Sequence, residues 1–312
     1  MNLRSKLTAL ILACGIVPMT ATITFSHITA KNTADGLSMH AVEDCEAATR
    51  SHLQALVDGR LAHVANYFDT IRDQLITTAA MPSAIDAVQQ FSASFDDIAR
   101  ENGLDVAAAR TSLQRYQENA FGAEYRRQNG RQGPVGSLIG RSDDAAIAAQ
   151  HYYLEENANP LGEKQRLAQS GDASTYSKVH GRYHPWFHQF QQTFGYYDVF
   201  LVDRAGRVVY SVFKEVDFGT SLANGAWSSS GLGKLFQQLQ TTPAGSYAFT
   251  DYERYAPSYE APASFIGAAI QSGGDVVGYL AFQMPIDEIN AIMASAKASV
   301  RPARSSSSAP AA

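Results

Sequence analysis

The sequence predicts an α+β protein in which a helical N-terminal half precedes an antiparallel sheet of about five strands. In the first half, apolar residues recur every three or four positions, which is typical of amphipathic helices. From Tyr183 onward, β-branched and aromatic runs alternate with short turns rich in Gly and Asp, as in hairpin-linked strands. Helices followed by a block of strands, without regular alternation of the two, favour the α+β class.

Residues 1–30 predict a cytoplasmic tip and a transmembrane helix. No Lys, Arg, Asp or Glu occurs from Leu7 to Ala30, and about 20 apolar residues suffice to span the hydrocarbon core. Arg4 and Lys6 precede this run and Asp35 follows it, a charge bias that places the N-terminus in the cytoplasm. We therefore expect an anchor in a bacterial inner membrane with the main domain in the periplasm. A cleaved signal peptide is the alternative.

Residues 31–82 predict a long stalk helix. Its apolar residues alternate at spacings of four and three, which indicates a coiled-coil-like seam; they are Val57, Leu61, Val64, Phe68, Ile71 and Leu75. This seam predicts either a homodimer through the stalk or packing of the helix on its own domain. Pro82 ends the helix, and Ser83 is suited to cap the next one.

The main domain is expected over residues 83–293, and the tail over 294–312 is expected to be disordered because it is mostly Ser, Ala and Pro. Further helices are expected over 83–91, 107–125, 143–154 and 231–239, with a loop over 130–140 and irregular chain over 157–177. Strands are expected over 197–202, 208–213, 247–252, 263–270 and 276–283.

Composition excludes several functions. With 25 Lys+Arg against 30 Asp+Glu and a net charge of −5, the chain has no basic field for nucleic acid. Two cysteines are too few for a disulfide scaffold or a cysteine-built zinc site. No nucleophile elbow, phosphate-binding loop or dinucleotide fingerprint occurs. We therefore expect no enzyme and no cofactor.

The densest aromatic cluster runs from Tyr183 to Phe187. Pro185 suits the first turn of a helix, so His184, Trp186 and Phe187 would lie where backbone N–H groups favour an anion. Core packing is the alternative. A metal site on His180, His184 and His188 is not expected, because Gly181 and Pro185 should interrupt the helix and keep the imidazoles apart.

A second group of aromatic residues surrounds one strand end, with charged residues in an earlier loop. Aromatic walls with one or two charges are typical of small-ligand sites, and a tyrosine-rich surface loop is the alternative. Together with the first cluster, these residues are the predicted ligand-binding set, which comprises His184, Trp186, Phe187, Tyr210, Lys214, Asp251, Tyr252, Tyr255 and Tyr259. Asp217 lies in the same loop as Lys214.

The chain resembles a known class of receptors. Met1 to Phe25 and the heptad helix up to Pro82 resemble the start of methyl-accepting chemotaxis receptors and related sensor kinases and cyclases. Four further blocks resemble their extracytoplasmic sensors of Cache type; they are Phe194 to Asp203, Val209 to Thr220, Pro262 to Ile270 and Gly278 to Asp287. The resemblance implies a PAS-like sheet and ligand sensing outside the cytoplasmic membrane, and it covers most of residues 1–293.

In amino-acid-binding members of this class, an Arg two residues before a Trp-Tyr pair holds the ligand carboxylate and a downstream Asp holds the amine. Here His184 stands in the Arg position, Trp186-Phe187 replaces the aromatic pair, and Asp251 is the candidate amine partner. Neutral His cannot replace a bidentate guanidinium, which argues against an α-amino acid. Such receptors continue into a signalling part that this chain lacks, so we expect a fragment, a truncated product or a protein that works through a partner.

These observations predict a membrane-anchored periplasmic sensor module that binds a small molecule in an aromatic-lined pocket. Binding would shift the stalk helices between two packings. A non-enzymatic interaction or structural protein, whose pocket is filled by its own side chains, is the alternative.

Overall fold

The computed structural model describes residues 22–23, 39–134, 138–286 and 289–291. The chain divides into two compact units, Met1–Asp69 with Glu288–Ala312, and Thr70–Asp287. The predicted anchor over 1–30 lies outside the described residues except at 22–23, and the predicted tail over 294–312 lies wholly outside them. Within the described ranges, no helix combines the length and the hydropathy that crossing a bilayer requires.

The expected long helix is present as α2 (Met39–Ala79). It ends just before α3 (Pro82–Phe95), where Pro82 occupies the first turn, a position that needs no backbone N–H. In the second compact unit, the seam residues Ile71 and Leu75 are buried. These two residues therefore pack on their own domain, and dimerisation through the stalk stays a prediction.

The remaining helical segments include the expected ones, two of them changed, together with short segments over residues 98–101, 164–166 and 256–258 where no helix was expected. The helix expected over 107–125 is broken at Ala120, and the one expected over 143–154 continues as a π-helical turn. The segments are α4 (Ile98–Glu101), α5 (Val106–Asn119), α6 (Phe121–Asn129), α8 (Asp144–Gln150), η1 (His151–Glu155), η2 (Lys164–Arg166), α9 (Thr175–Phe194), α10 (Gly231–Leu239) and η3 (Ala256–Ser258).

The five expected strands are confirmed and form one sheet. They are β1 (Asp198–Asp203), β2 (Val208–Ser211), β3 (Tyr247–Tyr255), β4 (Ala261–Ser272) and β5 (Asp275–Met284). Their order is β2-β1-β5-β4-β3, and every neighbouring pair is antiparallel. The class is therefore α+β, as the sequence predicts.

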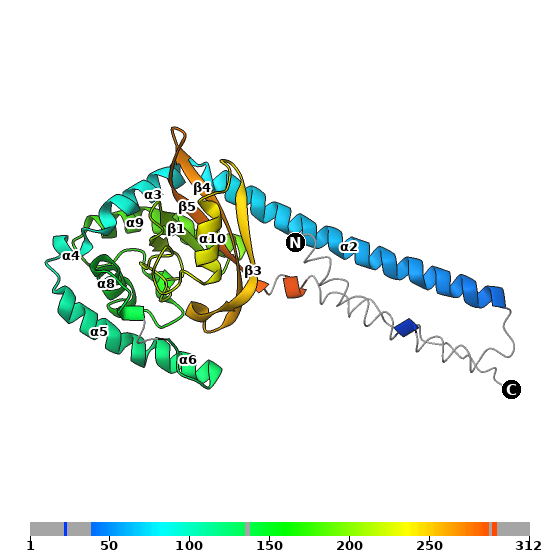
Figure 1. Cartoon of the computed structure of the whole chain (residues 1–312), viewed down its shortest axis with the longest axis horizontal. Coiled ribbons are helices and arrows are strands. Elements are labelled where there is room, and N and C mark those ends of the chain that lie inside the picture. Colours follow the sequence, from blue (N-terminus) through cyan, green and yellow to red (C-terminus); the bar gives the residue numbers. More distant parts are fainter. Residues whose placement is uncertain (1–21, 24–38, 135–137, 287–288, 292–312) are drawn as a thin grey trace, which may run out of the picture. The chain divides into compact units, whose positions relative to one another are not determined.

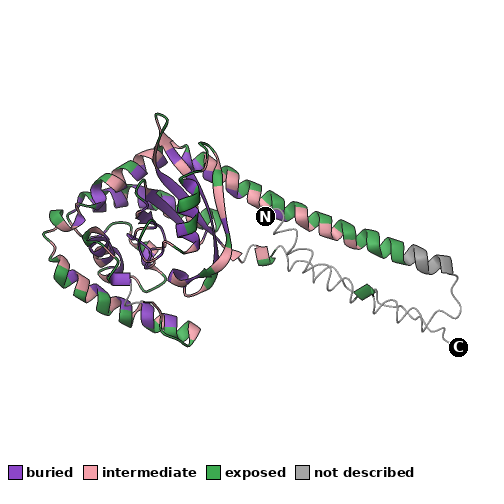
Figure 2. Cartoon of the chain, in the orientation of Figure 1, coloured by how far each residue is buried: buried purple, intermediate pink, exposed green. Residues whose placement is uncertain are grey.

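Helices cover both faces of this sheet (Figure 1). On one face lie α3 and α9, where the ring of Phe190 is 5.5 Å from that of Phe282. A Cβ on Gly278 of β5 would lie 2.5 Å from a methyl carbon of Val88 on α3, so α3 packs closely because this residue is Gly. On the other face lie α10 and the β2–α10 loop (residues 212–230), and the buried residues concentrate in these layers (Figure 2).

Helix α9 differs from the expectation at Pro185. This proline lies inside the helix, which begins at Thr175, so the expected helix start at Pro185 is wrong. Proline removes one N–H and crowds the carbonyl four residues before it, and here that residue is Gly181. A Cβ on Gly181 would lie 2.7 Å from the side-chain oxygen of Gln169, so glycine lets residues 165–170 lie directly against the helix.

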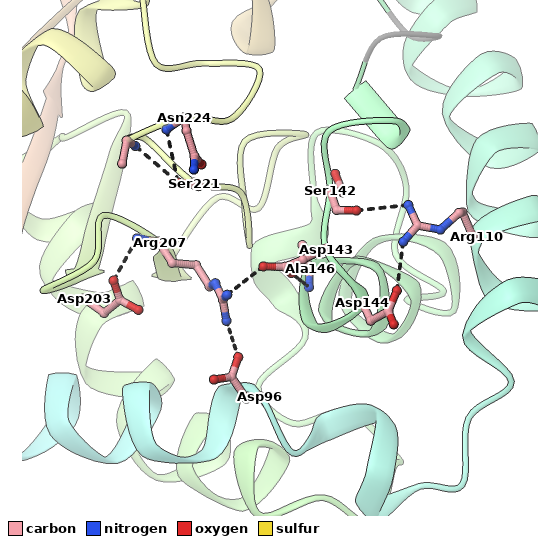
Figure 3. A network of polar contacts seen from close by, with 11 residues as sticks. Asp96, Arg110, Ser142, Asp143, Asp144, Ala146, Asp203, Arg207, Ser221 and Asn224 are labelled. Carbon is pink, nitrogen blue, oxygen red and sulfur yellow. Dashed lines mark hydrogen bonds and ion pairs between the residues drawn. The ribbon is translucent and has the colours of Figure 1, made fainter.

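One surface network joins the β1–β2 turn to two helix ends (Figure 3). The Arg207 guanidinium donates to Asp96 at the end of α3 and, over 2.6 Å, to Asp143. Asp143 also caps α8 by accepting from the N–H of Ala146 at 2.8 Å. The Arg207 side chain is only 22% exposed and both its charged partners belong to this chain. Its role is therefore to hold the fold together.

Candidate functional site

The structure distributes the predicted ligand-binding residues over four places. The residues His184, Phe187, Tyr210 and Lys214 meet where α9 crosses β2. The residues Tyr255 and Tyr259 border η3, and Tyr252 donates its hydroxyl to the carbonyl of Pro285 at 3.3 Å. Asp251 is exposed on β3, and Trp186 is 40% exposed on α9, where it stacks on Phe190 at 5.3 Å.

The three histidines of α9 form a stacked ladder. The rings of His180 and His184 are 4.5 Å apart and those of His184 and His188 are 5.4 Å apart, so the expectation that they do not align is wrong. His184 Nε2 lies 2.6 Å from the carbonyl of Gln165. A carbonyl only accepts, so Nε2 carries the proton and Nδ1 accepts from the Tyr210 hydroxyl at 2.8 Å.

This bonding keeps His184 neutral. Burial and the nearby Lys214 charge lower its pKa to about 2. His180 is held in the same way by the carbonyl of Ala168 at 2.6 Å. The spacing of four between these histidines therefore serves to fix residues 165–170 on the helix. Among the described residues, no group of three or more His, Cys, Asp or Glu side chains is placed so that it could hold a metal ion.

Lys214 is the central charged group of the region. It is 3% exposed, and its Nζ donates to the carbonyls of Ser211 and Val212, both at 3.2 Å. Burial lowers its pKa to about 7, against the opposing charge of Asp198. Its backbone is left-handed, with φ of 61°. A buried amine on a strained backbone costs stability, and such groups concentrate at functional sites.

Asp198 begins β1 and organises the start of the β2–α10 loop. Its Oδ1 accepts the N–H groups of Val199, Val212 and Phe213 at 2.7 to 2.9 Å. Its Oδ2 accepts the hydroxyl of Ser211 at 2.6 Å. Burial raises the pKa of Asp198 to about 7, although these donors oppose the rise.

Two acids, Glu215 and Asp217, lie further along the same loop. We call these two residues together with Gln283 of β5 the carboxyl cluster. Glu215 accepts the Tyr197 hydroxyl at 2.9 Å and the Ser258 hydroxyl at 2.6 Å. Asp217 accepts the Tyr255 hydroxyl at 2.5 Å. Burial raises the pKa of Asp217 to about 6. Burial and the neighbouring Asp217 raise that of Glu215 well above its usual range.

Gln283 connects this pair to the sheet. Its amide nitrogen donates to Ser258 Oγ at 3.2 Å, the same hydroxyl that donates to Glu215. Gln283 lies opposite Asp198 on β1 and Phe265 on β4, so all three side chains share the sheet face beneath the loop.

Two acceptor atoms of the carboxyl cluster lack hydrogen-bond partners among the described residues. They are Asp217 Oδ1 and Gln283 Oε1, on residues that are 1% and 3% exposed. The backbone N–H groups of Asp217 itself and of Phe218 lower the pKa of the Asp217 carboxyl. The Phe218 N–H donates its hydrogen bond to the Glu215 carbonyl at 3.1 Å. Buried acceptors without donors are uncommon in native proteins, and this cluster contains two of the ten such side-chain atoms among the described residues.

Sequence reasoning missed most of these groups. The predicted set does not contain Asp198, Glu215 or Gln283. Asp217 is noted in the sequence only as lying in the same loop as Lys214. The available signal was polar residues within otherwise apolar runs, since Gln283 is the one polar side chain from Val276 to Met284 apart from Tyr279. The pairing of Gln283 with Glu215 depends on strand register, which the sequence did not specify.

Comparison with known proteins gave structural likenesses only. No family model and no curated protein matches the chain. It is similar to the sensor domain of the V. cholerae histidine kinase DctB, with 15% identity and a TM-score of 0.28 over 56% of this chain and 60% of that one. It is also similar to the ligand-binding domain of the Pseudomonas fluorescens chemoreceptor CtaA in complex with L-isoleucine, with 12% identity and a TM-score of 0.27 over 61% of this chain and 63% of that one.

The solved structures that this chain resembles are sensor and ligand-binding domains. The chain spans about three fifths of each of these two domains.

Proposed function

We propose that this chain is the ligand-sensing module of a signal-transduction or chemotaxis receptor and binds a small molecule in an aromatic-lined pocket. The proposed pocket lies between the sheet and the β2–α10 loop, with Lys214, Tyr255 and Tyr259 at its border. The proposal includes an inner-membrane anchor over residues 1–30 and a periplasmic main domain, which the uncharged run from Leu7 to Ala30 supports. It assigns the chain no catalytic step.

One observation carries the proposal. Lys214, Asp198, Glu215 and Asp217 are ionisable groups with strongly shifted pKa values in one region of one small unit. Each buried charge costs free energy that apolar residues of similar volume would not cost. Clusters of this kind are candidate binding sites because a ligand can supply the missing interactions.

A chain of contacts connects the carboxyl cluster with α2. Tyr197 donates to Glu215 at 2.9 Å, and its neighbour Tyr196 donates to the side chain of Gln74 on α2 at 2.5 Å. A ligand that repositions Glu215 would change the position of this tyrosine pair. The proposed signal is a population shift in the packing of the last turns of α2.

The alternative function is that of an interaction or structural protein with a filled pocket. The His184 side chain favours it, because both ring nitrogens are bonded to atoms of the chain itself.

A thermal-shift screen of the full chain against amines, amino acids, carboxylates and sugars separates the two. A ligand at one hundred times its Kd stabilises the folded state by about 2.7 kcal/mol, so binding gives a clear rise in melting temperature. No rise with any compound would reject the sensor proposal in favour of the filled-pocket alternative.

A further inference from the structure

We infer that the ligand is a small organic cation whose ammonium group is held by Glu215, Asp217 and the side-chain oxygen of Gln283. This inference rests on the proposed function and names the chemical class of its ligand.

The first argument is the type of atom that lacks a partner. Asp217 Oδ1 and Gln283 Oε1 are both acceptors, and both belong to residues more than nine-tenths buried. A ligand that satisfies them must bring N–H or O–H donors. Gln283 is neutral and lies on the sheet, so it points to a donor independently of the two acids on the loop.

The second argument is the balance of charge. Burial raises the pKa of both Glu215 and Asp217, neighbouring acids raise that of Glu215 further, and only neutral donors lower either value. A cation placed beside them would stabilise both carboxylates at once. A ligand carboxylate in the same position would meet charges of its own sign.

The third argument is that three cations of the same unit already have hydrogen-bond or ion-pair partners. The Lys214 amine is held by two backbone carbonyls. Arg131 is paired with Glu260 at 3.1 Å, and Arg207 bonds Asp96 and Asp143. An anionic ligand would have to break one of these pairs, whereas a cation pairs with the two acids once they have released their protons.

The fourth argument is the aromatic surroundings. The hydroxyls of Tyr197 and Tyr255 bond the two acids directly, and the Tyr259 ring stacks on that of Phe121 at 5.2 Å. Aromatic rings close to carboxylates also occur where proteins recognise alkylammonium groups. A hydrated metal ion would gain less from the same surroundings.

The test is calorimetric titration of the full chain with matched probes. The probes are 1-butylamine, butyrate, 4-aminobutyrate and MgCl₂, and a diamine of the same length, 1,4-diaminobutane. We expect the amines to bind and butyrate and Mg²⁺ not to bind. The variants Glu215→Gln and Asp217→Asn should each weaken amine binding about tenfold or more, because each loses a charge-assisted hydrogen bond. Asp275→Asn removes the same charge from the exposed first residue of β5 and should bind like the parent.

Proton release is measured on the parent chain, so this result does not depend on whether the variants fold. Titrations of the parent at pH 6 in buffers of different ionisation enthalpy should show protons released on amine binding. The groups that can contribute are Glu215 and Asp217, with Asp198, Lys214 and the three tyrosines Tyr197, Tyr255 and Tyr259 around them. Amine binding without proton release would place the amine elsewhere and overturn the inference.

The outcomes distinguish the ligand class from the function. If a carboxylate or sugar from the thermal-shift screen binds and no amine does, the cation inference is wrong and the sensor function stands. Binding of Mg²⁺ in preference to the amines would also overturn it, in favour of an inorganic cation. If no compound of any class binds, both proposals fail.

Discussion

The buried carboxyl of Asp217 makes a definite prediction about how stability depends on pH. Its pKa rises from 3.8 to about 6 in the folded chain, so the folded state holds this proton more tightly than the unfolded state does. The resulting stabilisation is complete below pH 3.8 and is lost as the pH rises through 6. At about 1.4 kcal/mol per pKa unit, the loss is about 3 kcal/mol.

The variant Asp217→Asn isolates this contribution. Asn cannot titrate, and its amide oxygen can still accept the Tyr255 hydroxyl. The free energy of unfolding of the parent minus that of the variant should therefore fall by about 2 kcal/mol between pH 4 and pH 7. Urea denaturation followed by circular dichroism at each pH measures this difference. Asp275→Asn is the matched control, and its curve should run parallel to that of the parent.

Parallel curves for Asp217→Asn and the parent would refute the reasoning. A difference that grows with pH would mean that the Asp217 carboxylate is stabilised as an anion. The site would then already contain its countercharge, and the argument for a cationic ligand would lose its main support.

Three further predictions concern neighbouring residues. Lys214→Met removes a buried amine whose pKa is lowered to about 7, so the stability of the parent relative to this variant should rise by about 4 kcal/mol from pH 7 to pH 10; a flat difference in urea denaturation would contradict the lowered pKa. Ser211→Ala removes the hydroxyl that donates to Asp198 and accepts from the N–H of Lys214. It should lower the free energy of unfolding at pH 7 by about 1–3 kcal/mol, with Ser272→Ala in the β4–β5 hairpin as the control. Gly278→Ala places a Cβ 2.5 Å from Val88 and should lower the free energy of unfolding by about 1–3 kcal/mol; the double variant Gly278→Ala/Val88→Ala should recover part of this, and no recovery would contradict the packing argument.

The fold could be predicted well because its signals are local. Alternating apolar runs and Gly-containing turns located every strand of the sheet, and helix α10 was expected over the residues where it lies. The errors arose where tertiary contacts override local preference. Pro185 was expected at a helix start, but packing of residues 165–170 on the helix keeps α9 continuous through it.

The candidate site could be predicted only in part. Tyr255 and Lys214 belong to an aromatic and charged pattern that the sequence displays. Gln283 joins Glu215 only because β5 pairs with β1 and β4 in one register and because η3 places Ser258 between them. Trp186 and Asp251 were selected from their residue types, but both are exposed, on α9 and β3. Which side of a helix or strand faces solvent is set by packing between segments that are distant in the sequence.

Amide hydrogen exchange with the strongest stabilising compound from the screen tests the central claim most directly. Ligand binding at the carboxyl cluster should slow exchange in residues 212–220 and 255–260, and exchange in the β4–β5 turn should stay the same. Protection confined to the neighbourhood of Trp186 or Asp251 would contradict the account and move the site to the outside of α9 or to β3.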